Sequence, residues 1–256
     1  MHPVGWLVWA AGAGITTATT TNPFYLVPLV ACAYVVHAFH RSDRSNAPSF
    51  RIFAIFALVT LCMRTLLVVF GGSLAAAFVE GARLAVLLIV FGAFNSVADP
   101  LRILRLAPSR FHEAALSAAL ALSIAPRTIA AVAQVRDAQR LRGIGVSNWR
   151  AIPALAVPVL ETGMEDALTL AESMDARGHG RGRRTRYRPD RWDAPSAAAT
   201  AACAAAASAF LASYVTGDPT LSMPLFPLAW PDASPVLLVA ALTFAVPVMV
   251  PNGSDA

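Results

Sequence analysis

Residues 172–192 read ESMDARGHGRGRRTRYRPDRW, and this stretch divides a charged middle part of the chain from an apolar C-terminal part. Six arginines lie between Arg181 and Arg191, shortly after the tripeptide Ala176-Arg177-Gly178. The 256-residue chain is otherwise apolar, with 57% hydrophobic and only 14% charged residues. Because an ordinary soluble domain carries about 25% charged residues, this composition favours an integral membrane protein.

A helix that crosses a membrane needs about 20 mostly apolar residues. Six stretches come close to this, at 4–20, 24–39, 52–70, 82–98, 197–215 and 235–250. The first two could instead form one broken hairpin around Asn22-Pro23, which is a strong turn signal. The predicted fold class is therefore all-α, a polytopic membrane protein with about six transmembrane helices.

Arginine alternates with these stretches along the chain. Fifteen of the twenty arginines lie between residues 101 and 193, whereas the connections near residue 21, at 73–81 and at 216–234 contain none. The positive-inside rule then predicts a multi-pass protein of the cell membrane with both termini in the cytoplasm. We expect residues 1–99 and 194–256 to form the membrane part and residues 100–193 a cytoplasmic domain.

Two amphipathic helices are expected within that domain. The apolar stretch that ends at Pro126 is short for a span, and Pro126 suits a helix start. Apolar residues then recur at helical spacing over 127–142 and over 151–177. In the second segment they form one stripe, which consists of Ile152, Leu155, Val159, Gly163, Ala167, Leu170 and Met174. Such stripes must pack on each other, on the membrane part or on a partner.

Both segments end in the same way, with Leu141-Arg142-Gly143 and with Ala176-Arg177-Gly178. Glycine after the last periodic residue is a helix C-cap signal, and arginine in the last turn complements the helix dipole. An ordinary helix stop explains each end. A planar guanidinium at a helix end is also well placed to enter an acidic or carbonyl-lined groove of another protein.

These two ends occur within IAPRTIAAVAQVRDAQRLRG, residues 124–143, and IPALAVPVLETGMEDALTLAESMDARG, residues 152–178. Together with the layout of apolar stretches around them, they resemble the transmembrane T component of energy-coupling factor transporters. That family includes the permease subunit of cobalt and nickel uptake systems. The likeness covers most of the chain and is strongest over 94–180, although Leu141 stands where a small residue is common.

The resemblance implies that the two segments are coupling helices, whose Arg142 and Arg177 dock on two cytoplasmic ATP-binding subunits. Movement of those subunits on ATP would pass to a membrane S component that captures a micronutrient, a vitamin or cobalt or nickel. This chain would then catalyse nothing and bind no cofactor, and its partners would bind ATP and magnesium. It has no GxxxxGK[ST] sequence of its own for ATP.

The basic run after the second end is interpreted as a juxtamembrane anchor that sets topology and attracts anionic lipid. It consists of Arg181, Arg183, Arg184, Arg186, Arg188 and Arg191. A direct ATPase contact is the next interpretation. Nucleic-acid binding is not favoured, because only Tyr187 and Trp192 could stack on bases there.

Two other function classes stay open. A membrane-embedded lipid or prenyl transferase needs acidic clusters that hold Mg²⁺, for which Glu161, Glu165 and Asp166 are the candidates, although a solvated helix face also explains them. The second class is a basic membrane anchor or scaffold. Among single residues, Arg64 is the charge inside the third stretch and either pairs in the interior or snorkels to the interface.

Overall fold

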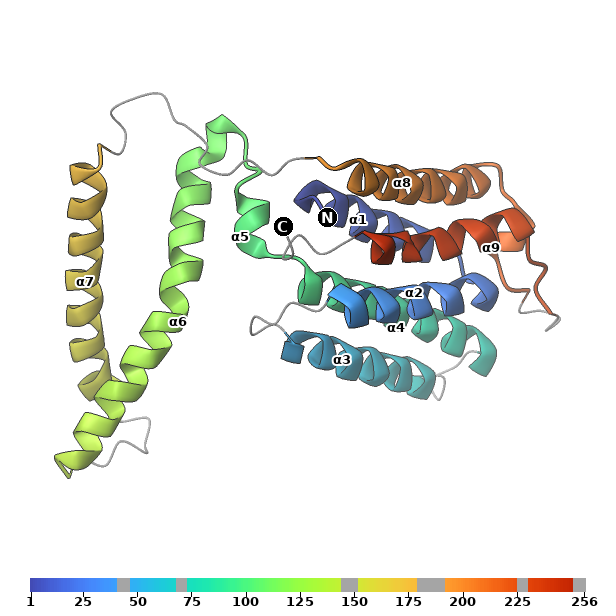
Figure 1. The fold of residues 1–256 in the computed structure, drawn as a ribbon. Coiled ribbons are helices and arrows are strands. Elements are labelled where there is room, and N and C mark those ends of the chain that lie inside the picture. The colour runs from blue at the N-terminus through green and yellow to red at the C-terminus, as the bar shows by residue number, and fades with distance from the viewer. Residues whose placement is uncertain (41–46, 68–72, 144–151, 179–191, 225–229, 251–256) are drawn as a thin grey trace. The chain divides into compact units, whose positions relative to one another are not determined.

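The computed structural model describes residues 1–40, 47–67, 73–143, 152–178, 192–224 and 230–250. Within these ranges all regular structure is helical, which confirms the all-α prediction. The α-helices are α1 (Pro3–Thr19), α2 (Pro23–His40), α3 (Ala47–Leu66), α4 (Leu74–Val97), α5 (Pro100–Leu104), α6 (His112–Leu141), α7 (Ile152–Ala176), α8 (Ala194–Val215) and α9 (Pro235–Leu242) (Figure 1). Short 3₁₀ segments are η2 (Ser109–Phe111), η4 (Pro219–Leu221) and η5 (Thr243–Met249).

The chain divides into two compact units. One comprises Met1–Leu106 with Asp190–Ala256 and contains α1 to α5, α8 and α9. We call it the bundle unit. The other comprises Ala107–Pro189 and contains α6 and α7. We call it the hairpin unit.

The core of the bundle unit lies between α1, α2, α4, α8 and the α9–η5 stretch. Its largest fully buried side chains include Trp9, Tyr25, Phe210 and Phe244. Small residues let these helices approach closely, as membrane helices commonly do. A Cβ added at Gly12 of α1 would lie 3.2 Å from Ala207 Cβ and 3.2 Å from the Phe244 ring.

The last apolar stretch changes from α-helix to 3₁₀-helix after Leu242. A 3₁₀ segment has poorer hydrogen-bond geometry than an α-helix, and neighbouring helices supply partners here. The Trp9 indole Nε1–H donates a hydrogen bond of 2.9 Å to the Phe244 carbonyl. The Cys32 thiol lies 3.7 Å from the Ala241 carbonyl oxygen. The change in helix type is therefore held in place by α1 and α2.

The turn between α1 and α2 is tied to the connection between α8 and α9. The fully buried Asn22 side chain donates to the Thr220 carbonyl at 2.8 Å and to the Asp232 carbonyl at 2.9 Å. Its Oδ1 accepts a hydrogen bond from the Phe24 N–H at 2.9 Å. α1 and α2 are thus two helices joined at Asn22-Pro23 by a specifically hydrogen-bonded turn, and the choice between two spans and one broken hairpin stays a prediction.

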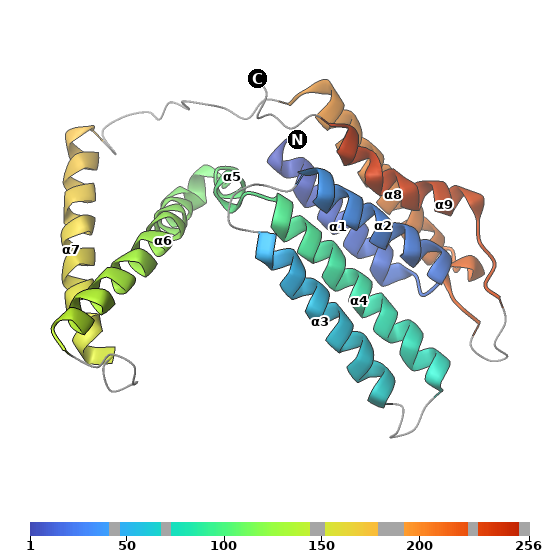
Figure 2. The ribbon, with the colours of Figure 1, turned by 60° about the horizontal axis from the view of Figure 1, so that its bottom comes forward.

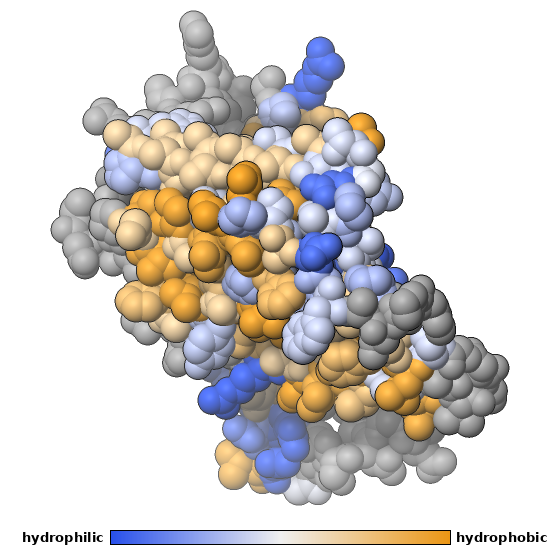
Figure 3. All heavy atoms as spheres, turned by 90° about the vertical axis from the view of Figure 1, so that its right-hand side faces the viewer, coloured by the Kyte–Doolittle hydropathy of each residue, from blue (hydrophilic) through white to orange (hydrophobic). Residues whose placement is uncertain are grey.

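α3 lies at the edge of the bundle unit and packs on α4 (Figure 1). Gly92 of α4 makes the close approach possible, since a Cβ there would lie 2.6 Å from Phe53 Cβ. The other faces of α3 are apolar and exposed, with Ile55, Phe56, Leu58, Val59 and Met63 all more than half exposed. Apolar residues also gather over a broad area of the face in Figure 3. Such surfaces suit contact with lipid.

Among the described residues, five helical segments are long and apolar enough to cross a membrane. They are Pro23–His40, Ser49–Leu66, Leu74–Val97, Glu113–Leu141 and Ala194–Val215. This supports the predicted transmembrane character. α1, with 17 residues, and the shorter apolar stretch Pro235–Met249 are not in this set. The count of six spans stays a prediction.

The predicted start of the fourth apolar stretch is wrong. α4 begins at Leu74, not near Ala82, and the Ser73 Oγ caps it by accepting the Ala76 N–H at 3.2 Å. The charges of Glu80 and Arg83 suggest a loop by hydropathy, but glutamate and arginine are good helix formers and α4 continues through both. Arg64 lies in the last turn of α3, and its side chain is exposed. This position near a helix end is the one that snorkelling to the interface requires.

The expected helix start at Pro126 is also wrong, because α6 runs through Pro126 from His112 to Leu141. Proline inside a helix removes one backbone hydrogen bond and costs about 3 kcal/mol. Alanine and leucine are common on both sides of Pro126 and are strong helix formers, so they favour continuation. Because the helix is uninterrupted, Glu113–Leu141 has the length and composition of a span. The apolar stretch before Pro126, taken alone, is too short for one.

Candidate functional site

The first Arg-Gly end closes α6 with a left-handed glycine. Gly143 has a φ of +76°, a conformation that glycine adopts without a steric penalty. Its N–H donates to the Arg140 carbonyl at 3.0 Å, and the Arg142 N–H donates to the Ala138 carbonyl at 3.3 Å. These bonds use carbonyls that the helix end would otherwise leave unpaired.

The second Arg-Gly end repeats this geometry on α7. Gly178 has a φ of +74°. Its N–H donates to the Asp175 carbonyl at 2.8 Å, and the Arg177 N–H donates to the Ser173 carbonyl at 3.2 Å. The prediction that both glycines are helix C-caps is confirmed. The docking role assigned to these ends stays a prediction.

The two Arg-Gly ends lie at opposite ends of one helical hairpin. α6 and α7 run in opposite directions, meet near the end of α6 and the start of α7, and diverge toward their other ends (Figures 1 and 2). The 25 residues of α7 correspond to about 37 Å of helix at 1.5 Å per residue. Arg142 and Arg177 are both exposed. The hairpin unit therefore presents two exposed guanidinium groups at two well-separated points.

Little of the hairpin unit is covered by its own residues. Among the residues between 107 and 178 whose burial the structure describes, none is buried. The predicted stripe on α7 is only partly covered: Val159, Leu170 and Met174 are half-buried, whereas Gly163 and Ala167 are exposed. Most of the apolar surface of α6 and α7 is therefore open to contact with other groups.

A second apolar stripe on α7 was missed. It consists of Val157, Leu160, Met164 and Leu168, and each of these side chains is at least 63% exposed. Their spacing of three and four residues places them on one helix face. This spacing is visible in the sequence. It was missed because the first stripe was by itself enough to predict an amphipathic helix. Exposed apolar faces of this kind mark interaction surfaces.

The basic run Arg181, Arg183, Arg184, Arg186, Arg188 and Arg191 lies outside the described residues. Its interpretation as a membrane anchor therefore stays a prediction. The acidic candidates for a magnesium site, Glu161, Glu165 and Asp166, are all exposed on α7. No group of three or more potential metal ligands occurs among the described residues.

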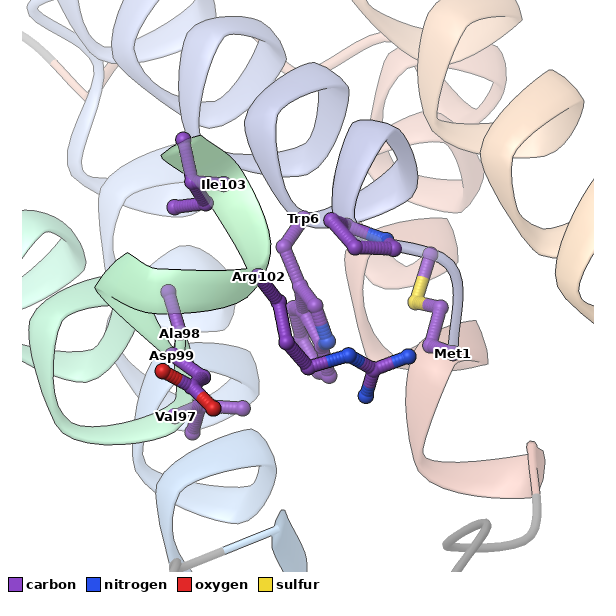
Figure 4. Close-up of a pocket in the computed structure, with 8 residues that line it drawn as sticks. Met1, Trp6, Val97, Ala98, Asp99, Arg102 and Ile103 are labelled. Atoms are coloured by element: carbon purple, nitrogen blue, oxygen red, sulfur yellow. The ribbon is translucent and has the colours of Figure 1, made fainter. Parts of the chain in front are cut away.

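A small pocket lies in the bundle unit between α1, α5 and the end of α4. Figure 4 shows the Arg102 side chain of α5 reaching toward Trp6 and Met1. The Asp99 side chain caps α5 by accepting the Leu101 N–H at 2.9 Å. With a volume of about 40 Å³, this cavity has room for a few water molecules. A lipid or prenyl substrate needs several hundred Å³.

The histidines of α2 have structural partners. His37 Nδ1 lies 2.7 Å from Ser96 Oγ of α4, and its ring stacks on Phe50. His40 Nε2 lies 3.1 Å from the Val250 carbonyl oxygen, to which it can donate a hydrogen bond. Both side chains thus connect the end of α2 to other elements of the bundle unit.

The three cysteines lie in the bundle unit. Cys32, Cys62 and Cys203 are free thiols. Cys32 and Cys203 are buried in the core of the bundle unit, and Cys62 is exposed on α3.

A scan against protein-family models gave no match, and a search of curated proteins gave none either. The likeness to the T component of energy-coupling factor transporters therefore rests on the motifs and the layout described above.

Proposed function

We propose that this chain is the transmembrane coupling subunit of an energy-coupling factor importer. Its partners would be two cytoplasmic ATP-binding subunits and a membrane S component that captures a vitamin, cobalt or nickel. In this proposal the chain resides in the cell membrane with both termini in the cytoplasm, and the partners bind ATP and magnesium.

The observation that carries the proposal is the pair of Arg-Gly ends at opposite ends of one hairpin. A subunit that couples to two ATPases needs two separate contact points on one stiff element. Exposed Arg142 and Arg177, about one helix length apart, meet this requirement. A helix cap accounts for each end taken singly, and the repetition of the Arg-Gly ending on two consecutive helices favours docking over capping alone.

The chemistry of the two ends suits docking. A guanidinium presents five N–H donors in a planar fork and makes strong hydrogen bonds to carboxylates and carbonyl groups. The left-handed glycine ends the helix directly after the arginine, so the side chain stands at the tip of α6 or α7. An acidic or carbonyl-lined groove could enclose each tip.

The uncovered hairpin supports the same proposal. The second stripe of α7 is exposed over four apolar residues in a unit without buried residues among those described. A subunit that works inside a larger assembly would have such a surface covered by its partners.

The test is a detergent pull-down of the tagged full-length chain from its native membrane. Wild type is compared with an Arg142→Ala/Arg177→Ala double variant and with a matched Arg127→Ala/Arg136→Ala control. The control removes the same charge from exposed positions on α6 that lie away from the helix ends. Co-purified proteins are identified by mass spectrometry.

We expect wild type and control to bring down P-loop ATPases and a small hydrophobic protein, and the double variant to lose the ATPases. Truncating one partner of a buried charged hydrogen-bond pair typically costs about 2–5 kcal/mol. Absence of any ATPase from a well-folded wild-type preparation would overturn the proposal, and the two ends would then be ordinary helix caps. If the control variant loses the ATPases to the same extent, the loss follows from removing positive charge from the hairpin unit and not from the two helix ends.

A further inference from the structure

The small pocket of the bundle unit brings an arginine side chain next to a nearly buried tryptophan. Arg102 lies on α5 and reaches toward Trp6 of α1 in this pocket (Figure 4). Trp6 is 7% exposed, and its indole N–H donates no hydrogen bond within the described part of the chain. Guanidinium and indole groups are hydrogen-bond donors without acceptor capacity. An oxygen anion between them would accept hydrogen bonds from both, and such charged bonds are strong.

We propose that this pocket binds the phosphate group of an anionic phospholipid, with Arg102 and Trp6 as its contacts. The proposal goes beyond the coupling function and needs only the transmembrane character of the chain. It concerns the described part of the bundle unit and is separate from the basic run at 181–191.

The pocket has the surroundings of a membrane interface. α5 follows the apolar helix α4 after Ala98 and Asp99, and the arginine-rich part of the chain begins there. His2, the N-cap of α1, stacks on Trp192 with ring centroids 4.2 Å apart. Tryptophan is enriched at membrane–water interfaces, and the positive-inside rule predicts that this end of α4 faces the cytoplasm. Basic pockets between helices on that side bind anionic lipid head groups.

The size of the pocket fits a phosphate group and not a whole lipid. Its volume of about 40 Å³ admits a group as large as a few water molecules. Pro3 of α1 lines the pocket. Leu7, Ala11 and Ile15 follow it at steps of four residues, so they share its helix face, and all three are exposed. A phosphate in the pocket would therefore leave its acyl chains room along this apolar face of α1.

Asp99 also lines the pocket, and its negative charge opposes an anion there. Its carboxylate caps α5 by accepting the Leu101 N–H at 2.9 Å. Asparagine caps helices as well as aspartate does, so Asp99→Asn removes the charge and keeps the cap. We therefore expect tighter lipid binding by this variant, a gain that a purely structural role of the pocket would not produce.

Native mass spectrometry of the purified full-length chain, with phosphatidylglycerol or phosphatidylcholine added, measures the fraction of lipid-bound protein. The variants are Arg102→Gln, Trp6→Phe, Asp99→Asn and the matched control Arg105→Gln, whose exposed side chain is outside the pocket lining. We expect wild type to prefer phosphatidylglycerol and Arg102→Gln to lose about 10-fold in affinity, as for one charged hydrogen bond. Trp6→Phe should lose about 3-fold, as for a neutral one. The control should bind as wild type does.

Circular dichroism and gel filtration check that each variant is folded. Equal binding of the two lipids by wild type, or equal losses in Arg102→Gln and Arg105→Gln, would overturn the proposal. If Arg102→Gln does not fold, Trp6→Phe and Asp99→Asn decide, and unchanged affinity in both contradicts the site.

A further arm adds inorganic phosphate to the lipid-bound chain. We expect phosphatidylglycerol to stay bound, because the acyl chains contribute to its affinity. Displacement by inorganic phosphate would assign the pocket to the free anion and overturn its assignment to lipid. None of these measurements involves an ATPase, so failure here leaves the coupling function untouched.

Discussion

The bundle unit and the hairpin unit are both helical, yet they use apolar residues in opposite ways. In the bundle unit Trp9, Tyr25, Phe210 and Phe244 are at most 1% exposed and form a continuous core. In the hairpin unit no described residue is buried, and Leu141 is 89% exposed. The bundle unit therefore buries its large apolar side chains, whereas the described part of the hairpin unit leaves many of them exposed.

Glycine shows the same contrast. Gly92 of α4 allows α3 to approach so closely that a Cβ would lie 2.6 Å from Phe53 Cβ. Gly163 of α7 has no atom within 4 Å of the place where a Cβ would stand. Identical residues in helices thus serve packing in one unit and have no packing role in the other. The following variants test this difference, from the largest expected effect to the smallest.

Trp9→Ala should lower the free energy of unfolding most, by about 3–5 kcal/mol. It removes a side chain that is 1% exposed and deletes the hydrogen bond to the Phe244 carbonyl. Leu160→Ala on α7 should change the free energy of unfolding by less than about 0.5 kcal/mol, because this side chain is 65% exposed. Unfolding in mixed micelles, followed by helical circular dichroism, measures both. Similar losses of unfolding free energy in the two variants would contradict the distinction between a buried core in the bundle unit and exposed apolar side chains in the hairpin unit.

Gly92→Ala and Gly163→Ala should have opposite signs. The new methyl group at Gly92 must displace Phe53 and should destabilise the bundle by about 1–3 kcal/mol. The same change at Gly163 meets open space and should stabilise α7 by about 0.5–1 kcal/mol, because alanine loses less backbone entropy in a helix. Thermal unfolding of the two variants side by side is the measurement. A destabilising Gly163→Ala would mean that α7 is covered at this point.

Gly143→Ala and Gly178→Ala should each cost about 1–2 kcal/mol locally, since alanine is strained in the left-handed conformation. The effect should be confined to the last turns of α6 and α7, because a Cβ added at either glycine would meet no neighbouring side chain or other element within 4 Å. Hydrogen exchange of the amides of Arg142 and Arg177 reports this local opening. The asparagine variants serve as controls, because asparagine tolerates this conformation better. Unchanged exchange in the alanine variants would contradict the cap assignment.

Several features were predictable from local pattern. The apolar stretches at 24–39 and 197–215 became α2 and α8. The glycines of both Arg-Gly ends adopt the left-handed conformation that their sequence position implied. Each of these depends only on composition or on a few neighbouring residues, which is why sequence reasoning reached them.

Other features depended on the extent of a whole helix. Pro126 looks like a boundary by its local chemistry, but helix-forming residues on both sides continue α6 across it. In the same way, the charges of Glu80 and Arg83 indicated a loop where the first two turns of α4 lie. The second stripe of α7 was visible as spacing, although nothing in the spacing indicated which stripe would face α6.

The sequence by itself determined that the chain is helical, mostly apolar and of transmembrane character, because hydropathy and helix period are properties of short windows. It also determined the form of the two Arg-Gly ends. Only the tertiary structure decided that Gly12 and Gly92 are sites of close packing and that Leu141 is left uncovered. It also decided that Arg142 and Arg177 stand at opposite ends of one hairpin. These facts depend on which helix lies beside which, and contacts between residues far apart in the chain are not written in any local pattern.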